Sequence, residues 1–176
     1  CDHYSTKLAS MDSPQRAPYQ DVSAIMPAAG GYFLDEMTFK DYLLNEYKQL
    51  ANYEHGIRGD YQAAKYYTQK IEKLQQGQMV APASFSDFKI GKVYRQDLKD
   101  ARYDLVEAMQ VFNIPENRYA LAIAQSRYDC WMDQTEEHKE FSGCEMEFKQ
   151  AMDSLVIPLD YYSDEDFYND FFDIGV

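Results

Sequence analysis

Three histidines, His3, His55 and His138, are the side chains of this sequence best suited to binding a metal ion or moving a proton. They are scattered along the whole chain, and none is paired with a cysteine or a carboxylate at a known ligand spacing. The nearest candidate is Glu136-Glu137-His138, but consecutive side chains at the end of a helix point in different directions. We therefore expect no metal site and no cofactor.

Other groups that could do catalytic chemistry are also poorly placed. Cys130 and His138 could form a nucleophile and its base on paper, but a disulfide would consume the thiol. Asp164 and Asp166 could bind calcium, yet they lack the glycine turn and the terminal glutamate of a calcium-binding loop. Neither a Gly-x-Ser-x-Gly elbow nor a phosphate-binding loop occurs. We expect that the protein is not an enzyme and has no catalytic residues.

The three cysteines suggest an anchor and a staple. Cys1 at the first position, with no Met before it, is what cleavage of a signal peptide in front of a lipidated cysteine leaves, although a chain cut by design is the alternative. Setting Cys1 aside leaves Cys130 and Cys144, which a short loop would bring together as a disulfide in an oxidising compartment. The alternative is two buried free thiols in a cytosolic protein.

Charge and hydropathy restrict the partners of the chain. The 30 acidic and 17 basic residues give a net charge of −13, which opposes binding to phosphate backbones and to anionic lipid surfaces. We therefore expect no nucleic acid partner. No stretch approaches the roughly 20 apolar residues that span a bilayer, so membrane attachment would come through lipid on Cys1.

Helical periodicity dominates the middle of the sequence, which predicts an all-α fold with four to five helices in antiparallel hairpins around one core. Thr38 and Asp41 form a capping signal, and Ser142 with Glu145 forms a capping box at the start of the last helix. Between the second and third helices we expect a long loop with a short turn at 85–88. The expected helices cover about 38–56, 60–76, 92–112, 115–137 and 142–156.

The two ends of the chain differ from this helical domain, which we place at 38–157. Residues 1–37 are rich in Pro, Gly and small residues and fit a lipid-anchored tether, although their second half could pack on the body. Residues 158–176 form a tail with six acidic residues and no Lys or Arg. Its six aromatic residues predict a binding segment for a partner, although they could equally fold back onto the same chain. These residues are Tyr161, Tyr162, Phe167, Tyr168, Phe171 and Phe172.

From about 42 to 155 the chain resembles the helical N-terminal domain of OmpA-family lipoproteins of alphaproteobacteria. The closest stretch is Tyr128-Asp129-Cys130-Trp131, followed by Gln134, Glu136, Glu137 and then Cys144; Leu43 to Tyr47 and the pair Tyr53-Glu54 also look similar. The resemblance implies a periplasmic protein at the outer membrane. Members usually continue into a peptidoglycan-binding domain that is not present in these residues, so peptidoglycan binding is not carried over.

Together these features predict a lipid-anchored periplasmic subunit with a structural or docking role in a cell-envelope or secretion assembly, with other protein subunits as partners. We expect it on the periplasmic face of the outer membrane, although Asp2 behind Cys1 resembles an inner-membrane retention signal. The alternative is a peptide-binding adaptor, because Gly59-Asp60-Tyr61 followed by Ala64 resembles the turn of a tetratricopeptide repeat.

Overall fold

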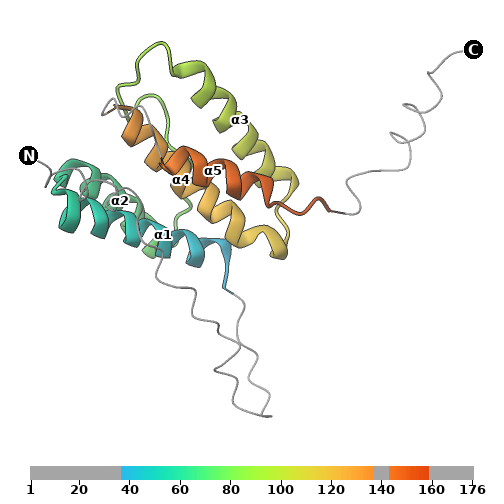
Figure 1. Cartoon of the computed structure of the whole chain (residues 1–176). Coiled ribbons are helices and arrows are strands. Elements are labelled where there is room, and N and C mark those ends of the chain that lie inside the picture. Colours follow the sequence, from blue (N-terminus) through green and yellow to red (C-terminus); the bar gives the residue numbers. More distant parts are fainter. Residues whose placement is uncertain (1–36, 137–142, 159–176) are drawn as a thin grey trace, which may run out of the picture.

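The computed structural model describes residues 37–136 and 143–158, and these form a bundle of helices without any strand (Figure 1). The all-α prediction is therefore confirmed for this part of the chain. The five α-helices are α1 (Phe39–Tyr53), α2 (Tyr61–Gln75), α3 (Arg95–Val111), α4 (Arg118–Glu136) and α5 (Gly143–Asp153).

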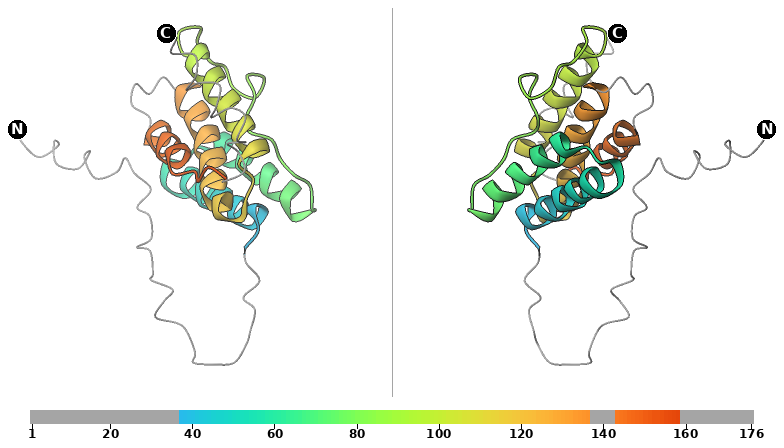
Figure 2. Two further views of the ribbon diagram at one scale, coloured as in Figure 1. Left: turned by 90° about the vertical axis from the view of Figure 1, so that its right-hand side faces the viewer. Right: turned by 90° about the vertical axis from the view of Figure 1, so that its left-hand side faces the viewer.

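Helix α4 is the central element of the bundle. It packs against α1, α3 and α5, while α2 packs on α1 (Figures 1 and 2). Every residue of α4 from Leu121 to Asp133 is buried, so this helix has no solvent-facing stripe. Polar residues on α4 must therefore find their partners inside the protein.

The α1–α2 hairpin has a capping residue at its start and a glycine at its turn. Thr38 Oγ1 accepts a hydrogen bond from the Asp41 amide at 3.2 Å, and Asp41 Oδ2 accepts one from the Thr38 amide at 2.9 Å. The predicted capping signal therefore takes the form of a capping box. The end of the helix differs from the expectation, because the chain continues past Tyr53 in a π-helical turn, Glu54–Arg58, before it turns at Gly59. Gly59 has φ of 69°, a conformation that glycine adopts without strain.

The loop between α2 and α3 is longer than the sequence predicted, because α3 begins at Arg95 and not near residue 92. The N-cap residue Tyr94 offers no side-chain acceptor to the first amides of the helix, so the preceding turn stays outside it. The predicted short turn is present. The Ser84 amide donates to Asp87 Oδ2 at 2.8 Å, and the Asp87 amide donates to the Ser84 carbonyl at 3.0 Å.

The Cys130–Cys144 disulfide joins α4 to α5, with 5.8 Å between the Cα atoms, which confirms the predicted staple. Pro115 opens a short 3-10 turn, Pro115–Asn117, in front of α4, as its place in the sequence indicated.

Several predictions concern residues outside the described ranges. They are the anchor at Cys1, the tether, the cap at Ser142 and the aromatic residues of the tail, together with His3 and His138. Within the described residues, none of the helices combines the length and the apolar character needed to cross a bilayer.

Candidate functional site

Asp129, near the middle of α4, is the hub of a buried polar network. Its Oδ2 accepts hydrogen bonds from Tyr47 Oη at 2.7 Å and from Lys70 Nζ at 2.5 Å. Its Oδ1 accepts a bond from the Ala83 amide at 2.7 Å. One carboxylate on α4 thus holds α1, α2 and the α2–α3 loop together.

Gln125 and Lys70 extend this network to the loop backbone. Gln125 Nε2 donates to Tyr47 Oη at 3.0 Å and to the Val80 carbonyl at 2.9 Å. Lys70 Nζ also donates to the Ala81 carbonyl at 2.9 Å. Since buried backbone groups need partners, these contacts fix residues 80–83 against the bundle without any regular secondary structure.

Burial sets the charge state of the network. It raises the pKa of the Asp129 carboxyl above its ordinary value, although the neighbouring Lys70 ammonium group acts in the opposite direction. Burial and the nearby Asp129 raise the pKa of Tyr47 well above its ordinary value, so its phenol remains a proton donor. Each N–H of the Lys70 ammonium has an acceptor, since Tyr47 Oη lies 3.5 Å away. The arrangement is suited to holding the loop.

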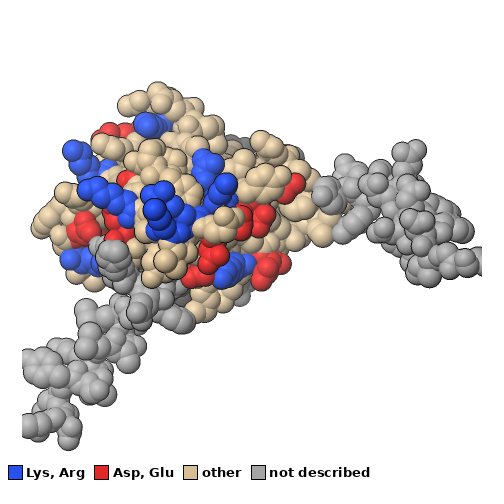
Figure 3. Space-filling model, turned by 90° about the horizontal axis from the view of Figure 1, so that it is seen from above, with Lys and Arg blue, Asp and Glu red and all other residues tan. Residues whose placement is uncertain are grey.

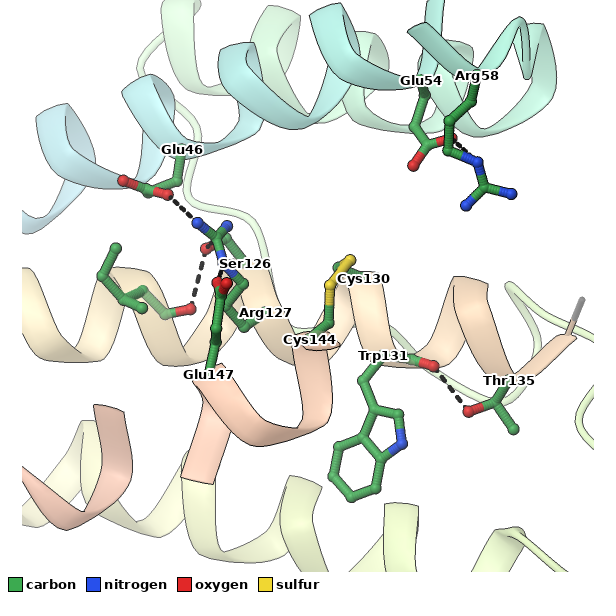
Figure 4. Close-up of a disulfide and its surroundings, with 11 residues drawn as sticks. Glu46, Glu54, Arg58, Ser126, Arg127, Cys130, Trp131, Thr135, Cys144 and Glu147 are labelled. Atoms are coloured by element: carbon green, nitrogen blue, oxygen red, sulfur yellow. Dashed lines mark hydrogen bonds and ion pairs between the residues drawn. A yellow bond between two sulfur atoms is a disulfide. The ribbon is translucent and has the colours of Figure 1, made fainter. Parts of the chain in front are cut away.

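A second charged cluster ties α4 to α1 and α5 beside the disulfide (Figure 4). Arg127 Nη2 lies 3.0 Å from Glu46 Oε2 on α1, and Arg127 Nε forms a short ion pair with Glu147 on α5. Arg127 and Glu46 are both buried. Covalent and ionic links therefore hold α5 against one short stretch of α4, from Arg127 to Cys130.

The α2–α3 loop separates two clefts that share one wall. The shared wall consists of residues 79–82 and Arg102. On one side is a cleft of about 370 Å³, named here the cationic cleft, which is also lined by Tyr66, Gln69, Lys70, Lys73, Ser84 and Asp87. On the other is a cleft of about 420 Å³, named here the apolar cleft, which is also lined by Phe39, Val106, Met109, Gln110, Asn113, Leu121 and Gln125.

A third hollow of about 360 Å³ lies between α3 and α5 and has the opposite charge. Trp131, Phe148 and Met152 contribute its apolar surface. Lys149 is its only basic residue, and its carboxylates belong to Asp97, Asp100, Asp104, Glu145 and Asp153.

Charge is unevenly divided between the described residues and the rest of the chain. The described residues hold 17 acidic and 14 basic side chains, so most of the net charge of −13 lies outside them. On the face shown in Figure 3, Lys and Arg side chains gather in a band across the middle. The helical body thus offers basic surface despite the acidic composition of the whole chain.

The sequence pointed to Cys130 and Cys144, and the structure brings them together. The predicted partner-binding residues of the tail, Tyr161, Tyr162, Phe167, Tyr168, Phe171 and Phe172, lie outside the described residues. The network around Asp129 was not predicted from the sequence. A usable signal was the spacing of Gln125 and Asp129, which places two polar residues one turn apart on a helix rich in Ala and aromatic residues.

Within residues 37–136 and 143–158, no three His, Cys, Asp or Glu side chains lie close enough together to hold a metal ion. No known family model matches the chain, and comparisons with characterised proteins and with solved structures found no significant match.

Proposed function

We propose that this protein is a structural or docking subunit of a cell-envelope or secretion assembly, attached by lipid on Cys1 to the periplasmic face of the outer membrane. The observation that carries the proposal is the Cys130–Cys144 disulfide, because such bonds persist in oxidising compartments and are rare in the cytosol. The disulfide uses two of the three cysteines, which leaves Cys1 for modification.

The use of buried polar groups supports a structural role. Charged side chains in the core form ion pairs and hydrogen bonds that tie the helices and the α2–α3 loop to one another. They belong to Asp129, Lys70 and Arg127. A rigid body with attachment segments at both ends fits a subunit that holds other protein subunits in place. The proposed role involves no enzymatic reaction, nucleic acid or peptidoglycan.

A peptide-binding adaptor is the second candidate, and the cationic cleft is the observation that favours it. We expect a peptide-binding groove to be lined by Asn, Tyr and Lys, and this cleft presents Tyr66 and Lys73, with Gln69 and no Asn. The α1–α2 hairpin, with its turn at Gly59, supplies one repeat-like unit. A solenoid groove needs about three stacked units, so the docking role is preferred.

The proposed function is tested by one set of measurements for the lipid anchor and another for the oxidising compartment. Intact mass of the protein from native membranes should show acyl chains on Cys1, and Cys1→Ser should move the protein from the membrane fraction to the soluble fraction. Thiol trapping in intact cells should leave Cys130 and Cys144 unlabelled. An unmodified chain in the soluble fraction, or two cysteines that label without reduction, would contradict the proposal. Separating the inner and outer membranes would show which one holds the anchored protein.

A further inference from the structure

We infer that the cationic cleft and the apolar cleft together bind residues 160–176 of the same chain, the part of the tail that contains all of its acidic and aromatic residues. The two clefts lie side by side and share the wall formed by residues 79–82 and Arg102. An occupant lying across that wall meets positive charge on one side and apolar surface on the other. The tail combines both complementary properties, since its acidic and aromatic residues alternate in short groups.

The cationic cleft carries positive charge that the body leaves uncompensated. Lys73 is exposed on its rim and pairs with no carboxylate in the described part of the chain. Arg102 donates only to backbone carbonyls, from Nε to Ala83 at 2.9 Å and from Nη2 to Pro82 at 3.4 Å. The single carboxylate of the lining, Asp87, is bonded to the Ser84 amide. An acidic segment would therefore be attracted to this cleft.

The apolar cleft offers matching surface for aromatic rings. Phe39, Val106, Met109 and Leu121 contribute apolar side chains, and Met79 on the shared wall is 61% exposed. Burying such surface contributes about 25 cal/mol per Å². In the tail, Asp164, Glu165 and Asp166 precede Phe167 and Tyr168 directly, so one short stretch can supply carboxylates to one cleft and rings to the other.

The described chain reaches the right part of the molecule for this contact. The Val156 amide donates to Asn117 Oδ1 at 2.8 Å, and Asn117 Nδ2 donates to the Val156 carbonyl at 2.8 Å and to the Phe112 carbonyl at 3.0 Å. The segment before the tail is thus held at the α3–α4 turn, next to Asn113 of the apolar cleft. Residues 159–176 can span roughly 60 Å when extended, which is ample for passing around this turn.

Two considerations favour the chain's own tail over other occupants and other sites. Tethering gives the tail an effective concentration on the order of millimolar, so a weak contact is enough for occupancy. The hollow between α3 and α5 would repel the tail, because five carboxylates line it against a single lysine. The contact does not depend on the proposed function, and a partner that binds the tail would have to displace it from the clefts.

Photo-crosslinking in the full chain tests this inference. Phe167→p-benzoylphenylalanine places the crosslinker in the middle of the tail, and mass spectrometry of the purified monomer locates the product. We expect crosslinks to residues 79–82 and to α3 between Arg102 and Met109. Lys73→Glu should lower the crosslink yield by about threefold to tenfold, since it replaces one attraction by a repulsion. Lys48→Glu, an exposed charge reversal on α1 away from both clefts, should leave the yield unchanged.

The inference would be overturned by crosslinks into the α3–α5 hollow, by the absence of intramolecular crosslinks, or by equal yields from the Lys73 and Lys48 variants. Mixing isotope-labelled and unlabelled chains reveals products that join two copies, and a majority of these would assign the clefts to a second copy instead. Unfolding curves of both variants show whether either is misfolded. If Lys73→Glu is misfolded, Lys73→Gln, which removes the charge without reversing it, should still lower the crosslink yield. Because purified chain without membrane or partner is used, failure here leaves the proposed function untouched.

Discussion

Tyr47 and Tyr67 are neighbouring core tyrosines whose hydroxyl groups have different surroundings. Both side chains are fully buried, and their rings stack with centroids 6.1 Å apart. Tyr47 Oη bonds to Asp129 and Gln125, whereas Tyr67 Oη has no hydrogen-bond partner within the part of the chain that the structure describes. The same substitution at the two positions therefore isolates the contribution of the network.

Tyr47→Phe should lower the free energy of unfolding by about 1–3 kcal/mol, because it removes a donor from Asp129 and an acceptor from Gln125. Tyr67→Phe should change it by less than about 0.5 kcal/mol, or stabilise the fold slightly, since no bond is lost. Urea unfolding of both variants measures the difference. Equal losses at the two positions would mean that packing of the ring, and not the network, sets the stability.

The network also predicts how stability depends on pH. Burial raises the pKa of Asp129 above 3.8, so the folded protein binds a proton at this carboxyl more tightly than the unfolded chain does. The stability that protonated Asp129 contributes is fully present below the pKa that this carboxyl has in the unfolded chain. It is lost as the pH rises through the pKa of the same carboxyl in the folded protein. Asp129→Asn cannot titrate, so the wild type should lose stability relative to this variant between pH 3 and pH 7. A relative gain over this range would show that the Lys70 ion pair outweighs burial.

Lys70→Met removes the cation beside the Asp129 carboxylate and should destabilise the fold by about 3–5 kcal/mol. The buried carboxylate must then either remain charged without its ionic partner or take up a proton. Lys65→Met is the matched control, since Lys65 is exposed on the same helix. Denaturant unfolding at neutral pH compares the two. Similar small effects at both positions would contradict the role assigned to Lys70.

At the scale of elements, the disulfide fixes the α4–α5 hairpin. Cys144→Ala should lower the free energy of unfolding by about 2–4 kcal/mol, because the unfolded chain is then no longer constrained by the loop that the bond closes. In a denaturant titration, the reduced wild type should have the same free energy of unfolding as Cys144→Ala, whether or not the variant is treated with reductant. If reduction leaves the wild type unchanged, the ion pairs of Arg127 with Glu46 and Glu147 suffice to hold α5.

The helices could largely be predicted from sequence because their signals are local. Thr38 with Asp41, Pro115 and the spacing of the core residues mark starts and faces within a few residues of the chain. The start of α3 was placed three residues too early, since Tyr94 lacks a capping side chain that would mark a boundary. The site depends on contacts that periodicity does not encode. Lys70 and Asp129 are 59 residues apart, and their pairing follows only from how α2 and α4 pack.

At the scale of the whole molecule, charge separates a nearly balanced body from acidic ends. The tail alone carries six of the 30 acidic residues together with six aromatic rings, and no basic residue. Aromatic surface left in water is unfavourable, so we propose that the tail binds a partner in the assembly, and the two clefts when no partner is bound. Either way the helical body should fold without it, because its core and both charged clusters lie within the described residues.

We propose that this chain is a docking subunit whose tail contacts the neighbouring subunits. Affinity purification from native membranes in mild detergent should recover partner subunits with the full chain. Deletion of residues 160–176 should abolish that recovery while leaving the helical signal and Tm nearly unchanged. Replacing the six tail aromatics by Ser, with every acid kept, should have the same effect. Partners that still co-purify with the truncated chain, or a truncated chain that melts much earlier, would contradict this proposal.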